Sequence, residues 1–264
     1  MASLAAACLA LPAHAGLFNN NFNADPSGVL TILDPAKWVS SGGVGGTGYI
    51  SLTDAVNGLT DVRLLRRPPH QWVASIEARP VSGLTLTADA GGTADLPYRG
   101  GMVQTSTTFA QTYGYFAVRA WIPSAPGVKP SACLQGTGGQ DWLPLIDIIQ
   151  APGAWSRGGR HLFCGLRYRD AAGAAQEVST DWGSPTSLAE GWHTYAVWWR
   201  PGRITWHVDG QQIASTEVGV PSVPCHLSLS CTVARDDGRW LGDPAQASWP
   251  QVLRIAWVRV WRER

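Results

Sequence analysis

WLPLIDIIQAPG, residues 142–153, is an apolar run that contains a single carboxylate, Asp147, among leucine and isoleucine side chains. An apolar run of this length, bounded by Pro and Gly, favours a buried β-strand over a helix. Successive side chains of a strand point to opposite faces, so Leu145 and Asp147 share one face. That face is where we expect a polar site.

Further strands are indicated by short alternating or β-branched runs between turn residues. We expect strands at 83–88, 115–122, 145–150, 194–199, 204–208 and 254–261. Asp209-Gly210 and Pro201-Gly202 are typical of tight hairpin turns, and the Gly-rich segment 41–48 is typical of a loop. Helical periodicity is nearly absent, with at most one turn at 187–192. This spacing predicts an antiparallel sandwich or barrel.

The length of 264 residues suits one large all-β domain. The first fifteen residues form a short apolar run ending in Ala13-His14-Ala15, which predicts a signal peptide cleaved after Ala15 and a folded domain over 16–264. A buried or frayed N-terminal segment is the alternative. The run is too short to span a bilayer. The signal predicts a secreted or periplasmic protein, and we expect a monomer.

Charge and metal-binding residues exclude several function classes. The formal net charge is +1 with no block of like charges, which argues against a nucleic-acid partner. The six His lie at no metal-ligand spacing, so neither a zinc site nor another cofactor is supported. Of five Cys, Cys8 leaves with the signal. The four that remain allow three disulfide pairings: Cys133, Cys164, Cys225 and Cys231.

Tryptophan is unusually abundant, with 14 in the chain. Five lie in expected strands, where sheet packing is the default: Trp198, Trp199, Trp206, Trp257 and Trp261. Five lie in expected loops, where they either tuck under the loop or face a partner: Trp142, Trp155, Trp182, Trp240 and Trp249. Indole faces stack well on sugar rings, so we expect at least one loop Trp to line a cleft.

Several segments together resemble glycoside hydrolase family 16, which includes laminarinases, lichenases, agarases and carrageenases. The matching segments are YGYFAVRAWIPSAPGVKPSACLQ (113–135), DWLPLIDIIQAPG (141–153), DPAKW (34–38), GLTLTAD (83–89), the hairpin at 191–213 and the closing RIAWVRVW. The resemblance implies a concanavalin-like β-jelly-roll sandwich of two curved antiparallel sheets with a groove for a linear glycan. It also leaves room for a structural calcium ion.

The family's catalytic strand reads Glu-x-Asp-x-x-Glu, with the nucleophile first and the acid/base last. By resemblance, Leu145 occupies the nucleophile position, Asp147 the middle position and Gln150 the acid/base position. A retaining glycosidase needs two carboxyl groups about 5 to 5.5 Å apart. An alkyl group cannot attack the sugar and an amide cannot deliver its proton, so we expect ordinary hydrolysis to be abolished.

Other departures from the family pattern cluster along the expected groove. Lys129 and Cys133 stand at two positions that are aromatic in the family, and Ala117 replaces a Glu while Arg119 is kept. The family's Glu-Trp pair is Trp198-Trp199 here. We expect the substrate-binding residues to be Trp142, Trp155, Trp182, Trp198, Trp240 and Arg119, with Asp147 and Gln150.

Three functions remain open. The leading hypothesis is a secreted polysaccharide-binding protein that has lost both catalytic Glu and uses Asp147 to hydrogen-bond sugar hydroxyls. The runner-up is an active endo-glycosidase or transglycosylase on a β-glucan or galactan, with relocated carboxylates. The third is a structural envelope protein, in which Asp147 is only a strand residue that keeps the local geometry.

Overall fold

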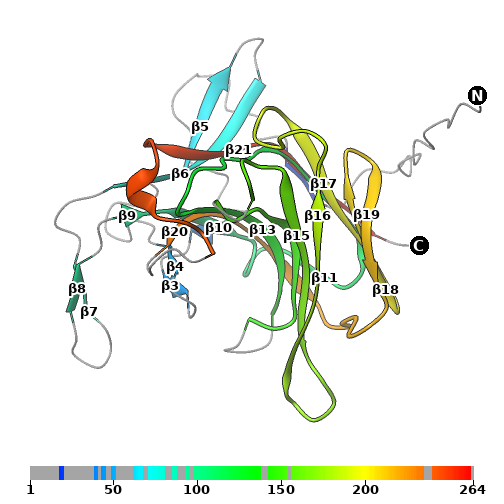
Figure 1. Ribbon diagram of the computed structural model, residues 1–264. Coiled ribbons are helices and arrows are strands. Elements are labelled where there is room, and N and C mark those ends of the chain that lie inside the picture. The colour runs from blue at the N-terminus through cyan, green and yellow to red at the C-terminus, as the bar shows by residue number, and fades with distance from the viewer. Residues whose placement is uncertain are drawn as a thin grey trace, which may run out of the picture.

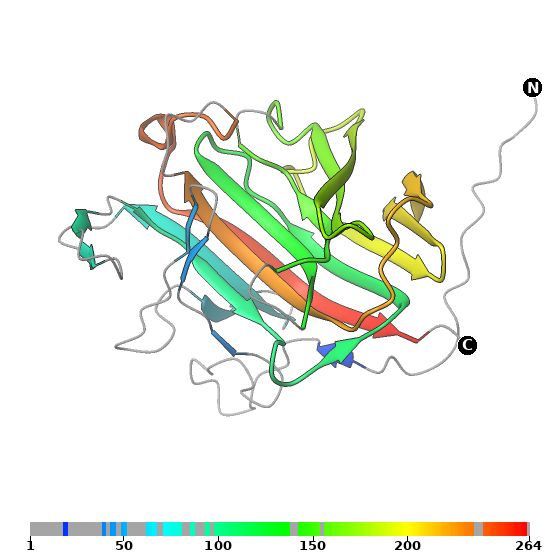
Figure 2. The same cartoon turned by 90° about the horizontal axis from the view of Figure 1, so that it is seen from below.

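The computed structural model describes residues 18–20, 39–40, 43–45, 49–51, 62–67, 71–80, 85–87, 93–95, 98–137, 142–153, 156–234 and 240–262. The expected signal peptide and its cleavage point lie outside this part of the chain. Within it, the protein consists of two stacked antiparallel sheets (Figures 1 and 2), which confirms the all-β sandwich. No helix in these ranges is long and apolar enough to cross a membrane.

One layer has nine strands among the described residues. Its path is β19 (Gln211–Thr216), β18 (Arg203–Val208), β17 (His193–Arg200), β12 (Gly114–Trp121), β21 (Gln251–Trp261), β6 (Gln71–Pro80) and β5 (Val62–Arg67). Beside this path, β1 (Phe18–Asn20) pairs with β21 and β9 (Tyr98–Arg99) pairs with β6. The first and last described strands therefore lie side by side.

The other layer has ten described strands. Its path is β16 (Ala175–Gly183), β15 (His161–Arg169), β14 (Leu145–Gln150), β13 (Val128–Gly136), β20 (Cys225–Ala234), β10 (Gly101–Gln104) and β2 (Val39–Ser40). Beside it lie β11 (Ala110–Gln111), β4 (Tyr49–Ser51) and β3 (Gly43–Gly45). A short 3₁₀ turn, η1 (Pro244–Gln246), precedes β21.

The hydrophobic core lies between the two sheets. Ile146, Ile148 and Ile149 of β14 face Val197, Trp199 and Trp206 of the other sheet, and all are nearly fully buried. Each sheet therefore has a second face turned away from the core. We call these the β14 face, on the ten-stranded sheet, and the β12 face, on the nine-stranded sheet.

Most of the expected strands and both hairpin turns are confirmed. Asp209 and Gly210 have φ of 49° and 83°, as a two-residue hairpin turn requires, and Gly202 has φ of 72°. Two expectations were wrong in part. The run at 83–88 gives β7 (Thr85–Thr87), which pairs only with β8 (Thr93–Asp95) in a separate ribbon, and the Gly-rich 41–48 contains β3 paired with β4.

Candidate functional site

A bulge in β14 determines which of its side chains face outward together. Cys133 of β13 is paired with Asp147 and Ala132 with Ile149, which leaves Ile148 as the extra residue. Ile148 and Ile149 consequently both enter the core, while Asp147 and Gln150 point to the β14 face. Leu145 lies two residues before Asp147 on that face. The three motif positions therefore share one face.

Asp147 is held by a buried polar network. Its side chain is 2% exposed, and its Oδ2 accepts a hydrogen bond from Arg167 Nη2 on the neighbouring strand β15 at 3.0 Å. With the Gln150 amide in the orientation that satisfies both of its ends, its nitrogen donates to Asp147 Oδ2 at 3.0 Å. Its oxygen then accepts from Arg167 Nη2 at 3.3 Å and Lys129 Nζ at 3.1 Å. Gln150 therefore bridges an anion and two cations.

Two neighbours of Asp147, Trp206 and Gly165, hold its backbone and make room for its side chain. The indole N–H of Trp206 crosses from the other sheet and donates to the backbone oxygen of Asp147 at 2.6 Å. On the outward side the carboxylate leans over β15 at Gly165, where a Cβ would lie 2.6 Å from Asp147 Oδ2 and 2.9 Å from Phe163 Cε1. Glycine at 165 thus makes room for the carboxylate.

Burial dominates the electrostatics of the network. It raises the pKa of Asp147 to about 6, although Arg167 and Lys129 oppose the shift. Burial also lowers the pKa of Lys129, against the opposing effect of Asp147. A carboxyl group with this pKa carries its charge at neutral pH but takes up a proton under mildly acidic conditions.

Two of the expected aromatic residues lie at opposite ends of β14. The Trp240 ring lies 6.1 Å from Phe163 of β15 and 5.7 Å from Lys129 Nζ of β13, so it lies above the end of β14 that carries Gln150. Trp142 precedes the other end and is 48% exposed, with φ of 62°. Trp155 lies outside the described residues. Trp240 is thus the aromatic candidate that contacts the network's surroundings.

Three expected substrate-binding residues lie away from the β14 face, and their role in binding stays a prediction. Trp182 lies within β16 rather than in a loop, and it packs against the core opposite Leu162. Trp198 and Arg119 lie on the β12 face, on the sheet that does not contain β14. Alternation shows which residues share a face, but it does not show which sheet carries that face.

The β14 face contains polar side chains that the sequence did not single out. Arg167 of β15 pairs with Asp147 of the adjacent strand β14. Strand β20 adds a row of polar side chains that are at most 8% exposed: His226, Ser228, Ser230 and Thr232. In β20 these residues alternate with core Cys and Leu side chains. The period-2 pattern of CHLSLSCT is the signal that could have revealed this row.

Two other carboxylates share this face at its edge strand. Glu177 of β16 is paired in register with Arg167, and Asp181 with Phe163. Asp181 also contacts His161 Nδ1 at 2.9 Å. Neighbouring strands lie about 4.8 Å apart and β15 separates β16 from β14, so the backbone of Glu177 lies roughly 10 Å from that of β14.

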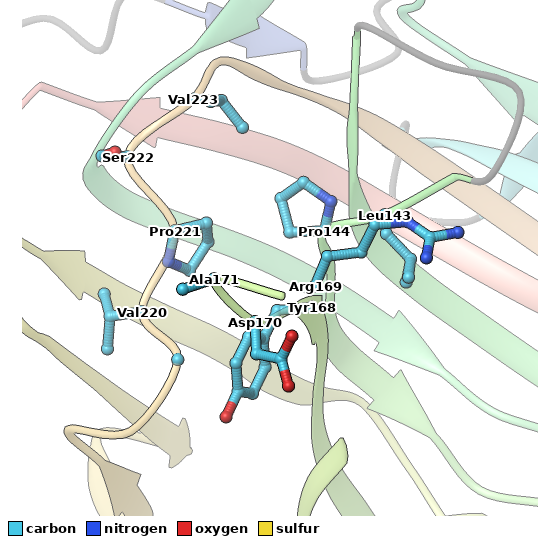
Figure 3. Close-up of a pocket in the computed structure, with 11 residues that line it drawn as sticks. Leu143, Pro144, Tyr168, Arg169, Asp170, Ala171, Val220, Pro221, Ser222 and Val223 are labelled. Atoms are coloured by element: carbon cyan, nitrogen blue, oxygen red, sulfur yellow. The ribbon is translucent and has the colours of Figure 1, made fainter. Parts of the chain in front are cut away.

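A separate hollow of 510 Å³ opens beyond the Trp142 end of β14 (Figure 3). It is lined by Leu143, Pro144, Tyr168–Ala171 and Gly219–Val223. Its one carboxylate, Asp170, is engaged in its own turn, accepting from the amides of Ala172 and Ala174 and from Gln176 Nε2. The hollow therefore brings no reactive pair together.

The four cysteines expected in the mature chain are buried and unpaired. Cys133 lies on the β14 face beside Asp147, and burial raises the pKa of its thiol to about 12. Such a thiol is a poor nucleophile at neutral pH. Within the described ranges, no group of three or more His, Cys, Asp or Glu is placed to hold a metal ion. A structural calcium ion stays a prediction.

Comparison with known proteins identifies relatives of this architecture. The model of the family described as "Glycosyl hydrolases family 16" matches residues 70–257. Endo-1,3-1,4-β-glycanase ExsH of Rhizobium meliloti is 30% identical over 167 residues, which are 57% of this chain and 32% of ExsH. The β-glucanase of Fibrobacter succinogenes is 25% identical over 57% of this chain and 43% of its own length. The chain spans about a third of the first of these relatives.

Solved structures share the fold across almost the whole chain. The laminarinase catalytic domain of Thermotoga maritima has a TM-score of 0.72 at 21% identity, covering 94% of this chain and 98% of its own. A Bacteroides ovatus family 16 protein, solved with a G4G4G3G product, has a TM-score of 0.73 at 16% identity, with coverage of 92% and 99%. These likenesses confirm the jelly-roll fold.

Proposed function

The chain belongs to glycosyl hydrolases family 16, and from that premise we propose that it is a secreted protein that binds a β-glucan or related polysaccharide without hydrolysing it. The observation that carries the proposal is the composition of β14. Its outward positions hold Leu145, Asp147 and Gln150, where the chemistry of glycoside cleavage requires two carboxyl groups.

The state of Asp147 supports the loss of hydrolysis. The carboxylate is 2% exposed and hydrogen-bonded to both Arg167 and Gln150, so attack on a sugar would first require those bonds to break. Its neighbour Leu145 offers no lone pair, and Gln150 offers no transferable proton. The general acid alone contributes about 10² to 10⁴ in rate, so its absence is a large loss even before the nucleophile is considered.

Glycan binding is supported by the family and by the aromatic residues near β14. The relatives include proteins described as β-glucanases, and one solved relative holds a glucan product. In this chain, Trp240 supplies an indole ring beside the polar network, and the exposed Trp142 precedes the other end of β14. Indoles that stack on sugar rings, together with polar groups that bond hydroxyls, are sufficient for binding and need no acid.

The test measures binding and cleavage side by side. Purified protein is mixed with laminarin, lichenan, agarose and carrageenan, and reducing-end release is followed together with tryptophan fluorescence. We expect saturable binding to at least one glycan without release. For laminarin or lichenan, which are neutral, Trp240→Ala should weaken binding about tenfold, equivalent to about 1.4 kcal/mol, while the matched control Trp198→Ala on the β12 face should leave it unchanged. Release of oligosaccharides that disappears in an acid-to-amide variant would overturn the proposal.

A second candidate function rests on Glu177. This exposed carboxylate lies on the same face as Asp147, and inverting glycosidases separate their acids by about 6.5 to 9.5 Å, close to the two-strand spacing. Hydrolysis by this pair predicts glycan release that is lost in both Asp147→Asn and Glu177→Gln. Absence of release from the unmodified protein on all four glycans excludes it for those substrates.

A further inference from the structure

The β12 face carries aromatic and arginine side chains in register across three strands. Tyr115 of β12 lies between Trp198 of β17 and Trp261 of β21, with ring centroids 6.4 Å and 5.7 Å apart. Farther along the same strands, Arg119 is paired with Trp257 and Trp121 with Arg254. None of these side chains contributes to the core between the sheets.

Three arginines of this face lie over its indole rings. The guanidinium carbon lies 4.4 Å from the ring centroid in Arg200–Trp198, 4.5 Å in Arg259–Trp257 and 5.2 Å in Arg254–Trp121. Stacking uses the flat face of a guanidinium and leaves its N–H donors directed around the edge. The indoles therefore fix the arginines in place for recognition of an anion.

Positive charge is concentrated here far beyond the chain's average. Among the described outward side chains of this sheet are six arginines, while the whole chain has a net charge of +1. Arg79 and Arg203 lie beside Glu77 and Glu217, and the other four are Arg119, Arg200, Arg254 and Arg259. Among the described strands of this sheet the one acidic residue is Glu77, which contacts Arg79 at 3.6 Å.

The acids in the adjoining connections are largely paired. Asp209 contacts His193 at 2.7 Å, Glu217 contacts Arg203 at 3.5 Å, and Glu190 lies in the connection before β17. The ion pairs of Asp209 and Glu217 thus involve His193 and Arg203 rather than Arg119, Arg200, Arg254 or Arg259.

The positive charge is arranged in a line. Successive outward residues of a strand lie about 6.7 Å apart, so Arg254 and Arg259 are separated by roughly 15 Å along β21. A repeating anionic chain can contact such a line at several points, whereas a single small anion contacts one. The indoles of this face are only partly exposed, which favours an extended polar ligand over insertion into a lipid surface.

We propose that the β12 face is a second glycan-binding surface, whose ligand is an acidic polysaccharide bearing carboxylate or sulfate groups that pair with the stacked arginines. This site is independent of the β14 face and goes beyond the function proposed for it. The protein would then hold an acidic chain on one face and a neutral chain on the other.

The experiment uses polygalacturonate as the acidic probe and laminarin as the neutral one. The intact chain should bind polygalacturonate, and binding should weaken at least tenfold between 50 and 500 mM NaCl, because surface charge interactions are screened by salt. The double variant Arg200→Gln/Arg259→Gln should weaken polygalacturonate binding at least tenfold. The control Arg169→Gln, an exposed arginine of β15 in the other sheet, should leave it within twofold.

The two faces are distinguished by crossed variants. Trp240→Ala should leave polygalacturonate binding intact, and the arginine double variant should leave laminarin binding intact if the β14 face binds that glycan. Retention of full polygalacturonate affinity in the folded double variant, judged by an unchanged melting temperature, overturns the proposal. Equal or tighter binding to duplex DNA or to vesicles of anionic phospholipid also overturns it, because the ligand would then not be a glycan.

Discussion

The β14 and β12 faces are the two outer surfaces of one sandwich, and they differ in how far their charged side chains are buried. On the β14 face Asp147 is buried and accepts hydrogen bonds from Arg167 and Gln150, which lie on the same face. On the β12 face, Arg200, Arg254 and Arg259 lie over indole rings and remain partly exposed. A buried ion strongly needs its partner, whereas an exposed stacked cation is solvated with or without the ring.

This contrast has a functional meaning. The network around Asp147 satisfies its own charges, so a ligand there is recognised by hydrogen bonds and stacking rather than by net charge. The β12 face instead gathers partly exposed arginines, which is why we propose a polyanion as its ligand. Four experiments test the contrast, beginning with the one that should have the largest effect.

Removing the partner of Asp147 should be the most damaging change. Arg167→Met leaves a buried carboxylate without its ion pair, and we expect a loss of about 3 to 4 kcal/mol in unfolding free energy at pH 8. The loss should shrink at pH 5, where Asp147 takes up a proton. Urea denaturation at both pH values measures it. A loss of the same size at both pH values would show that the damage arises from packing rather than charge.

The raised pKa of Asp147 predicts a pH dependence of opposite sign to that of most carboxylates. Burial raises its pKa from 3.8 to about 6, so the native state binds this proton more tightly than the unfolded chain does. The stability it contributes is complete below pH 4 and is lost as pH rises through 6, by about 2 to 3 kcal/mol. The difference in unfolding free energy between the unmodified protein and Asp147→Asn should fall by that amount from pH 3.5 to 7. A flat difference contradicts the assigned burial.

Adding a methyl group beneath the carboxylate should have a smaller effect. The Cβ of Gly165→Ala would lie 2.6 Å from Asp147 Oδ2, so the side chain must move within a packed network. Overpacking of this kind costs about 1 to 3 kcal/mol. Gly191→Ala is the matched control, since its Cβ meets nothing within 4 Å. Equal melting temperatures for the two variants would mean that the Asp147 side chain can shift away from the new methyl group without a loss of stability.

The smallest effect on stability should come from the β12 face. Arg200→Met removes a cation–π contact with Trp198 but retains most of the aliphatic packing, and we expect a change of about 0.5 to 1 kcal/mol. Thermal unfolding measures it beside Arg167→Met. A loss as large as that of Arg167→Met would remove the distinction between the two faces.

The sequence was sufficient to predict the sandwich because apolar alternation and turn residues are local signals. It located β12, β14, β17, β18 and β21 to within a few residues at each end. It did not single out the central strands β6, β13, β15 and β20, nor the edge strand β16, where most side chains are exposed and no apolar face repeats. Its Trp182 was therefore assigned to a loop.

The site was only partly predictable because its members are distant in the chain. The residues at 145, 147 and 150 were found together, since they belong to one strand. Arg167 was not, because its contact with Asp147 depends on the pairing of β14 with β15. Trp198 and Arg119 were expected beside this motif but lie on the other sheet, because alternation does not reveal which sheet a strand joins.

The bulge at Ile148 shifts the alternation of β14 by one residue, and this shift is a property of the backbone rather than of any outward side chain. Whatever residue occupies position 150, acid or amide, will project beside Asp147. Reactive and inert side chains can therefore be exchanged on this strand without a change in the backbone. A protein engineer can substitute positions 145, 147 and 150 and expect each new side chain to project on the same face.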